Sequence, residues 1–404
     1  MEKLVEPGQT IDRKRERKLR FACGMALALA AMAVLLAGEI APLWGKVLLA
    51  TALLFAAHRA MTGTPGVAVL TYHSVTDAPS WLPWSGEITV HPRSFAAQLA
   101  MLRRMNLRTI GDEDMADLRA RGQVPAKDCV VIHFDDGYLD NLAFAAPMTR
   151  AAGFSATIFP SLDFIEPEDS PRQNDDSAGY LRWSELRRLR DEFCWRVESH
   201  GIDHSRIPTS ERAVDVVTRE NWRRHAWLQW RAMPGAKHDW FRSDAPPAVP
   251  IGSPVPESAL ALAACGWTDG RREDESDLRL RLHHHLATSR QRVAQEMGRP
   301  AAIFCWPENR ACPAGREIAW QTGYVATTAG KGRNTANESP SVISRLHVGD
   351  RALGFRWPWA DAQLLRAQIR LMQGNFYWYP IVAAMNATRK AVFAWRKWQR
   401  RSHP

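Results

Sequence analysis

The chain has 404 residues, which is enough for one catalytic domain with additions but too short for several large domains. Its formal charge of +10 sits at the ends, because residues 21–380 hold 40 basic against 39 acidic side chains and leave the excess to residues 1–20 and 381–404. The near-neutral centre excludes a broad phosphate-binding groove, so we expect no nucleic-acid partner, whereas the basic ends suit anionic lipid headgroups.

The first predicted element is a membrane anchor over residues 21–60, behind a basic N-terminus of residues 1–20 that faces the cytoplasm. Phe21–Gly38 is an uncharged apolar run of 18 residues, long enough to cross a bilayer. A cleaved signal peptide is the alternative, but this run is longer than the apolar core of a signal peptide. A second apolar run, Ile40–Ala57, contains a proline and a lysine and either completes a hairpin or lies in the membrane interface. One span would export the following domain, and two would return it to the cytoplasm.

Short apolar strands then alternate with amphipathic helices through residues 61–355, which we expect to form the catalytic domain. The predicted strands are Val67–Tyr72, Cys129–Phe134, Ser155–Pro160, Cys194–Ser199, Ala302–Trp306 and Tyr324–Thr328, and the predicted helices include Phe95–Met105, Leu139–Ala152 and Ser289–Met297. This alternation favours an α/β fold with a mainly parallel sheet or barrel and functional side chains at the C-terminal ends of the strands. Six scattered cysteines are expected to be small buried hydrophobic residues: Cys23, Cys129, Cys194, Cys265, Cys305 and Cys312.

One region breaks this alternation. About 100 residues separate His204 from Trp306, far more than an ordinary connection, and we predict an insert at about 207–285. Four tryptophans lie in it: Trp222, Trp227, Trp230 and Trp240. Rigid aromatic rings suit the faces of sugars, which favours a lid beside the active site. A structural excursion unrelated to substrate is the alternative.

The last predicted element is a membrane-interface segment over residues 356–404. The aromatic run Asn375–Pro380 precedes Ile381–Trp398, in which Arg and Lys are interspersed with apolar residues. This pattern is typical of a basic amphipathic helix that lies on a membrane, and an ordinary packed terminal helix is the alternative.

Two motifs carry the chemistry. Paired aspartates in His133–Tyr138 follow an apolar strand, so one carboxylate can turn toward a metal and the other toward a water molecule. A later strand is followed by Glu198–His204, where His200 and His204 lie four residues apart around Gly201 and can bind one divalent ion. Taken alone, Asp-Asp-Gly is also a common turn, and a histidine pair is also a common surface feature.

Together these motifs resemble the polysaccharide deacetylase family, carbohydrate esterase family 4, whose signature is Asp-Asp-Gly after one strand and His-x-x-x-His after a later one. The resemblance covers roughly residues 66–350. Val69–Val75 is similar to the entry strand of the biofilm poly-N-acetylglucosamine deacetylase branch, which places a histidine, here His73, in the active site. Phe304–Pro307 resembles the family's Phe-x-Tyr-Pro strand, and Ser344–Leu346 resembles its late strand. The resemblance implies a distorted (β/α) barrel, to which the N-terminal membrane helix or hairpin and the long insert are additions.

The resemblance also implies roles for individual residues. These are Asp136, His200 and His204 as metal ligands, Asp135 as general base and His73 as general acid, for which His347 is the competing candidate. A tetrahedral oxyanion also needs donors, and a backbone N–H near Tyr138 or in the strand of Trp306 and Pro307 could supply them at the substrate. Arg345 would orient Asp135 and lower its pKa through its charge, and a surface strand residue is the alternative for it. Zinc suits a set of one aspartate and two histidines best, although cobalt, nickel and iron also fit it. A cation of this kind lowers the pKa of water and polarises a carbonyl, and a neighbouring carboxylate can then remove the proton.

Two local features modify this interpretation. The family often has Pro-x-Gly where this chain has Pro307 followed by Glu308 and Asn309, so the loop that shapes the substrate site is altered. The run His283–His285 is not interpreted as a metal site, because consecutive helical residues point in different directions.

The predicted function is therefore metal-dependent removal of an N-acyl group, acetyl first, from an amino sugar in a bacterial polysaccharide or lipid-linked glycan precursor. A deformylase acting on a lipid-linked amino sugar and a non-catalytic, membrane-tethered glycan-binding protein are the alternatives. We expect the protein at the bacterial inner membrane. The basic C-terminal tail and unpaired cysteines favour a hairpin with the domain on the cytoplasmic face, and a periplasmic domain behind one span is the alternative.

Overall fold

The computed structural model describes residues 12–38, 42–77, 81–123, 127–169, 178–241, 248–268 and 270–402. Residues 1–11, which form the larger part of the predicted basic N-terminus, lie outside these ranges.

An eight-stranded parallel sheet forms the centre of the molecule, with its strands in the order β12-β13-β14-β1-β5-β6-β7 and with β4 beside β5. These strands are β1 (Ala68–Tyr72), β4 (Arg108–Thr109), β5 (Cys129–Asp136), β6 (Thr157–Pro160), β7 (Arg196–Val197), β12 (Ile303–Phe304), β13 (Ala326–Gly330) and β14 (Val342–His347). Strands β1 and β5 are almost wholly buried, as expected for parallel strands covered on both faces. Ser199, just after β7, forms an isolated parallel bridge with Phe304, so the sheet curls until its two edges meet.

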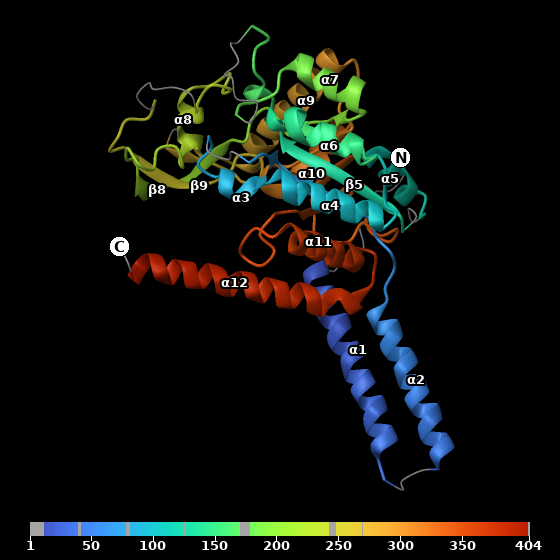
Figure 1. Ribbon diagram of the computed structural model, residues 1–404. Coiled ribbons are helices and arrows are strands. Elements are labelled where there is room, and N and C mark those ends of the chain that lie inside the picture. The colour runs from blue at the N-terminus through green and yellow to red at the C-terminus, as the bar shows by residue number, and fades with distance from the viewer. Residues whose placement is uncertain are drawn as a thin grey trace.

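Helices cover the outside of the curled sheet (Figure 1). They are α3 (Ser85–Ile88), α4 (Pro92–Arg104), α5 (Asp112–Ala120), α6 (Ala146–Ala151), α7 (Trp183–Phe193), α9 (Glu275–Met297), α10 (Pro313–Gln321) and α11 (Pro358–Met372), with short turns η1 (Asn141–Ala145), η2 (Leu162–Phe164), η3 (Pro307–Asn309) and η4 (Phe376–Trp378). Their apolar residues face inward at helical spacing; in α4, for example, Phe95, Leu99 and Leu102 enter the main core. The arrangement confirms the predicted α/β fold with a barrel-like parallel sheet.

Every predicted strand is present, although the ends differ. The predicted start of one strand at Cys194 is wrong, because Cys194 has φ 57° and forms the left-handed C-cap of α7, so β7 is confined to Arg196–Val197. The prediction of buried cysteines holds for Cys129 and Cys305 and is wrong for Cys23 and Cys194, which are exposed. Cys265 and Cys312 are half-buried.

The insert forms a separate layer beside the barrel. Its elements are β8 (Arg206–Val216), α8 (Ala226–Ala232), β9 (Pro254–Leu260), β10 (Trp267–Thr268) and β11 (Arg271–Arg272). Outside the insert, β2 (Ser74–Val75), which follows the first barrel strand in the chain, pairs with β3 (Thr89–Val90). Strands β8 and β9 pair antiparallel, and α8 carries Trp227 and Trp230 into a second core that is rich in aromatic rings. Helix α9 follows, and its Leu278, Leu282 and Leu286 join the main core. The insert therefore ends, in packing terms, where α9 begins.

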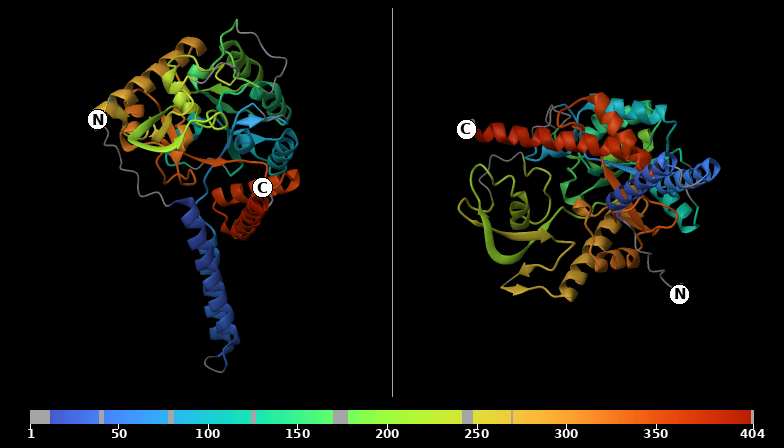
Figure 2. Two further views of the ribbon diagram at one scale, coloured as in Figure 1. Left: turned by 90° about the vertical axis from the view of Figure 1, so that its left-hand side faces the viewer. Right: turned by 90° about the horizontal axis from the view of Figure 1, so that it is seen from below.

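Two N-terminal helices, α1 (Arg13–Leu36) and α2 (Leu43–Met61), run side by side and project from the domain (Figures 1 and 2). They approach closely at Gly24, where a Cβ atom would lie 2.4 Å from Met61 Cγ. Helix α1 is long and apolar enough to cross a membrane, and only 11% of its apolar stretch is buried. The base of this pair is fixed to the domain, because Glu16 forms a 2.8 Å ion pair with the buried side chain of Arg333.

Candidate active site

Four strands of the one parallel sheet bring the predicted site residues together near their C-terminal ends. Asp135 and Asp136 end β5, His200 follows β7, His73 follows β1, and Arg345 lies in β14. All of them line one cavity of about 530 Å³, as do Tyr138, His204 and His347. Parallel strands place these side chains at one edge of the sheet, which is why residues far apart in sequence meet here.

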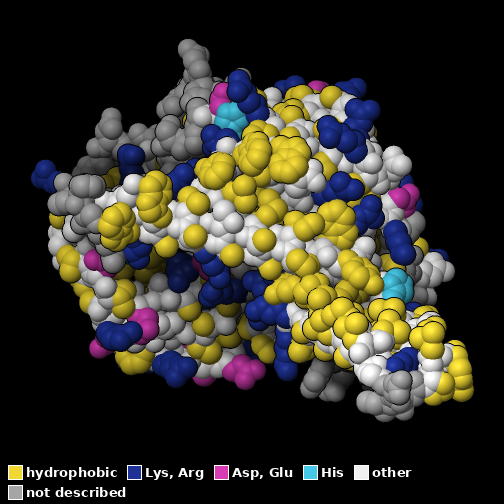
Figure 3. Space-filling view, turned by 60° about the horizontal axis from the view of Figure 1, so that its bottom comes forward, with side chains coloured by type: hydrophobic (Ala, Val, Ile, Leu, Met, Phe, Trp, Pro, Cys, Tyr) yellow, Lys and Arg dark blue, Asp and Glu magenta, His cyan; other side chains and the backbone are white. Residues whose placement is uncertain are grey.

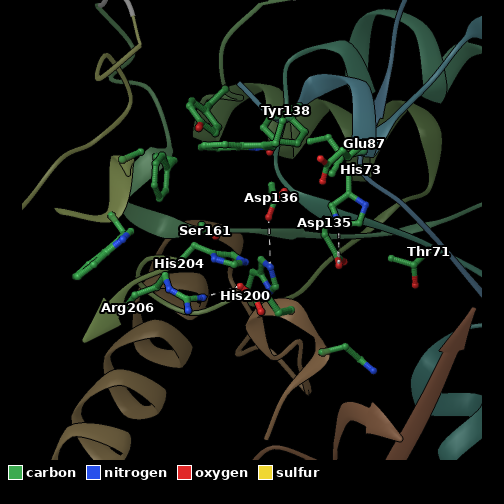
Figure 4. Close-up of a pocket in the computed structure, with 18 of the residues that line it drawn as sticks. Thr71, His73, Glu87, Asp135, Asp136, Tyr138, Ser161, His200, His204 and Arg206 are labelled. Carbon is green, nitrogen blue, oxygen red and sulfur yellow. Dashed lines mark hydrogen bonds and ion pairs between the residues drawn. The ribbon is translucent and has the colours of Figure 1, made fainter. Parts of the chain in front are cut away.

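Asp136, His200 and His204 form a compact group (Figure 4). Their ligand atoms all lie within 4.8 Å of one another, and Asp136 Oδ1 lies 3.3 Å from His200 Nε2. His200 Nδ1 lies 2.7 Å from the carbonyl oxygen of Cys305, which favours the proton on Nδ1 and leaves Nε2 to face Asp136. One carboxylate and two imidazoles at this spacing fit a divalent transition metal such as zinc.

The backbone at the end of β5 explains how the two aspartates diverge. Asp136 has φ 72°, in the left-handed region that aspartate tolerates better than most residues. Gly137 follows with φ 79°, and a Cβ atom there would lie 2.9 Å from Pro160 Cβ. The sharp turn therefore requires the Asp-Asp-Gly sequence and aims neighbouring carboxylates at different targets.

Asp136 and the histidines around it stabilise each other's charged forms. Burial acts against the charge on Asp136, but the hydrogen bond to His200 and the charges of His73, His200 and His204 lower its pKa. Burial also acts against protonation of His200, yet nearby Cys305 and the hydrogen bond to Asp136 raise its pKa. A bound cation would take the place of the proton in this pair, since imidazole binds a metal in its neutral form.

A second cluster of Asp135, His200 and Cys305 also has three ligand atoms close together. It fits a metal less well, because burial raises the pKa of Cys305 and keeps it a thiol, and the metal-binding form of cysteine is the thiolate. The Cys305 Sγ lies 3.6 Å from Asp135 Oδ1, so the thiol can donate a hydrogen bond to this carboxylate.

Asp135 is held by Arg345. Nη1 of Arg345 lies 2.7 Å from both carboxylate oxygens, and both side chains are buried. Burial raises the pKa of Asp135, but the charges of Arg345, His200 and His73 outweigh it and bring the pKa to about 2. Asp135 is therefore ionised at neutral pH, as a general base must be.

Both predicted acids lie beside this pair. His73 Nε2 is 3.8 Å from Asp135 Oδ2, and the ring of His347 makes a T-shaped contact with that of His73 at 5.3 Å. Asn141 Nδ2 donates to the backbone oxygen of His73 at 2.7 Å. Four buried polar atoms of cavity-lining residues have no hydrogen-bond partner within the described ranges, so they are available to a ligand or to water: Thr71 Oγ1, His73 Nδ1, Ser161 Oγ and Trp230 Nε1.

The structure corrects the expected contribution of Trp306 and Pro307. Trp306 is fully buried, its backbone N–H donates to Thr328 Oγ1 at 3.0 Å, and Pro307 has no backbone N–H. Neither residue lines the cavity. Tyr138 lines the cavity and forms an antiparallel bridge with Tyr180. The hydrogen bonds of this bridge are made by the residues on either side of the two tyrosines, so the backbone N–H of Tyr138 takes no part in it.

Two residues of the altered loop after Pro307 line the cavity, and the sequence had assigned no role to either of them. Glu308 and Asn309 have positive φ values of 49° and 55°, so the altered loop after Pro307 turns its side chains into the cavity. Asn309 Oδ1 accepts from Arg345 Nε at 3.1 Å, and Glu308 pairs at 2.9 Å with Arg206 of β8. This loop therefore connects the catalytic group to the insert, a contact between segments about 100 residues apart.

A buried carboxylate behind the cavity was also missed. Asp140 accepts from Ser74 Oγ at 2.6 Å and from Val75 N at 3.1 Å, and burial raises its pKa to about 7. It fixes the segment that follows His73. The only sequence signal for Asp140 is that it lies two residues after Tyr138 of the Asp-Asp-Gly motif.

The loop that carries His200 and His204 is supported from α9. Ile202 N donates to His285 Nε2 at 2.8 Å, and His285 is buried. Gly201 has φ 91°, and a Cβ atom there would lie 2.4 Å from His285 Nε2. His285 thus supports the candidate metal site from behind, as hydrogen-bonding neighbours of metal ligands commonly do.

Comparison with known proteins finds similarity in the part of the chain that holds the two motifs. Residues 122–242 match the family model of polysaccharide deacetylase. YxkH of Bacillus subtilis strain 168, provisionally named a polysaccharide deacetylase, is 31% identical over 91 residues, which are 22% of this chain and 30% of that protein. The matched region thus spans less than a third of the relative's length.

A solved structure shares the fold. A de-N-acetylase from Aggregatibacter actinomycetemcomitans is 18% identical, with 69% of this chain and 94% of that chain covered at a TM-score of 0.50. IcaB from Ammonifex degensii is also 18% identical, with 74% and 97% covered at a TM-score of 0.48. The predicted family domain and its fold are confirmed, and the roles of single residues stay predictions.

Proposed function

Because the chain carries a polysaccharide deacetylase domain, we propose that it is a metal-dependent hydrolase that removes the N-acyl group, acetyl first, from an amino sugar of a bacterial glycan. The observation that supports this most directly is the cavity in which Asp136, His200 and His204 lie together beside an Asp135 carboxylate paired with Arg345.

The residues of this chain divide the proton transfers between them. Asp135, ionised and held by Arg345, takes the proton of the attacking water. His73, 3.8 Å from Asp135, lies where it can give a proton to the departing amine, and His347 is the competing acid. The N–H of Tyr138, at the turn after the aspartates, is our candidate donor to the oxyanion.

Asp136, His200 and His204 would hold the divalent metal, and zinc suits this set best. When bound, the metal supplies a water of lowered pKa and polarises the acyl carbonyl.

We also propose that the insert closes over the sugar. Trp227 and Trp230 of α8 line the cavity together with Trp84, and Arg206 links the start of β8 to Glu308 at the cavity wall. Flat aromatic walls favour sugar rings. Trp222 and Trp240 belong to the aromatic core and do not line the cavity. Only two of the insert's four predicted tryptophans, Trp227 and Trp230, are therefore candidates for contact with a sugar.

The proposed location is the bacterial inner membrane, with the α1–α2 pair inserted as a hairpin. Exposed leucines, Leu29 and Leu36 in α1 and Leu48 and Leu54 in α2, favour lipid contact. Both ends of the hairpin join the domain on one side, next to the basic residues in the first turns of α1, which favours a cytoplasmic domain (Figure 1). A lipid-linked amino sugar, acetylated or formylated, would then be within reach.

The test is metal content and acyl release by the purified full chain in detergent, on a panel of N-acetylated and N-formylated amino sugars, free and lipid-linked. We expect one metal per chain and released acid, both lost in Asp136→Ala and His200→Ala. Metal without release from any substrate would remove the enzymatic proposal, and absence of metal from the unmodified protein would favour a glycan-binding role.

A further inference from the structure

One face of the C-terminal helix α12 (Tyr379–Ser402) contacts the domain along most of the helix. Val382 is fully buried against α11, and Arg396 Nη1 donates to the oxygen of Gly354 at 2.8 Å, so one face of the helix packs on the protein. The remaining faces are exposed. A packed terminal helix alone would not explain the chemistry of those faces.

One exposed face carries an apolar stripe. Tyr377, Ile381, Ala384, Ala391, Trp395 and Trp398 recur at intervals of three, four or seven residues, and all are exposed. Trp395 is 55% exposed and Ile381 is 42% exposed. Lys390 and Lys397, seven residues apart and also exposed, form a second strip along the same helix. Aromatic rings beside lysines match the boundary between acyl chains and anionic headgroups.

The stripe begins at the hairpin. Tyr377 Oη lies 3.1 Å from Nδ1 of His58 in α2, and the ring of Tyr379 lies 5.5 Å from that of Phe21 in α1. Helix α12 runs crosswise to the hairpin at its base in the front view, and the left-hand view of Figure 2 looks nearly along α12 beside the top of the hairpin (Figures 1 and 2). Hydrophobic side chains continue from the hairpin along α12 on the underside, with Lys and Arg beside them (Figure 3).

We propose that α12 lies in the headgroup region of an anionic lipid membrane, with its apolar stripe toward the acyl chains, while the hairpin crosses or enters the same bilayer. The continuity of the two apolar surfaces favours lipid over a second copy of the chain, and the lysine strip adds attraction to anionic headgroups. Because the free end of α12 points to the same side as β8 and β9, this orientation sets the insert beside the lipid surface (Figures 1 and 2). The inference rests on membrane insertion of the hairpin, which its test examines separately.

The test uses the full chain in bilayer nanodiscs of phosphatidylcholine, with or without phosphatidylglycerol. A benzoylphenylalanine photo-crosslinker replaces Trp395, Leu29 of α1 or Trp320 of α10 in three separate proteins. Leu29 is 53% exposed and probes the hairpin, whereas Trp320 is 61% exposed on the catalytic domain and is the matched control. Adducts are identified by mass spectrometry, so no enzymatic activity is needed.

We expect phospholipid adducts at positions 29 and 395 at least tenfold above those at 320. Lys390→Gln with Lys397→Gln should lower the adduct at 395 at least twofold in phosphatidylglycerol bilayers and leave it unchanged in phosphatidylcholine alone. Lipid adducts at 29 with only the control level at 395 would overturn the position of α12, as would an adduct at 395 to a second chain. Absence of lipid adducts at both positions would overturn the hairpin as well.

Discussion

Replacing Arg345 by methionine should expose the cost of a buried, unpaired carboxylate. The pKa of Asp135 falls from 3.8 to about 2 in the folded protein even though burial acts in the opposite direction. That difference alone corresponds to about 2.5 kcal/mol of stability at neutral pH. Since Arg345→Met leaves the carboxylate buried without its partner, we expect a loss of about 3 kcal/mol at pH 7.

The sign of the pH dependence follows from the depressed pKa. The stabilisation by Asp135 is complete above about pH 4 and disappears as the pH falls toward 2, where both folded and unfolded chains become protonated. The difference between the native protein and Arg345→Met should therefore shrink over that window. Urea unfolding of the full chain in detergent, at a series of pH values, measures it.

Two further variants make the test decisive. Arg310 has a 70% exposed side chain and lies 3.9 Å from Glu308, so Arg310→Met should change stability by less than about 0.5 kcal/mol. Asp135→Asn combined with Arg345→Met removes both charges and should be less destabilised than the sum of the single changes by about 2 kcal/mol. A coupling below about 0.5 kcal/mol would refute the buried-pair reasoning.

Three other outcomes are expected. Gly201→Ala drives a Cβ atom against His285 and should weaken metal binding about 10- to 100-fold in equilibrium dialysis. Gly252→Ala, at φ 94° in open space, is the control and should leave metal binding unchanged. Equal losses of metal affinity in the two variants would contradict the clash with His285. Asp136→Ala should lose both bound metal and acyl release, and stoichiometric metal in this variant by elemental analysis would remove Asp136 from the ligand set. Trp227→Ala should raise KM about 5-fold with little change in kcat, as for loss of one aromatic contact, and an unchanged KM would reject the sugar-facing wall.

The catalytic motifs were readable because the sequence places them directly after strands. Asp135, Asp136 and the His200–His204 pair follow apolar runs, and parallel strands bring such positions to one edge of a sheet. Gly137 and Gly201 were also informative, since each has a positive φ that its turn requires. Local pattern therefore predicted an α/β fold with a mainly parallel sheet or barrel, and the resemblance to the deacetylase family supplied the distorted barrel and the roles of the candidate site residues.

Other features depended on segments that meet only in the folded chain. Cys194 looked like the start of a strand, but its backbone N–H donates to Leu189 O and it forms the left-handed cap of α7. Trp306 looked like a cavity residue, but its ring is buried in the core and its backbone N–H donates to Thr328 Oγ1. The supports of the site, His285 behind Gly201 and Asp140 behind His73, come from distant helices or turns.

The sequence by itself determined which residues could do the chemistry, because residue type and strand position set metal affinity and proton transfer locally. Tertiary structure alone decided which cations and carboxylates pair, which tryptophans reach the cavity, and where α12 lies relative to the hairpin. Those outcomes depend on burial and on contacts across long stretches of chain, and neither periodicity nor spacing encodes them.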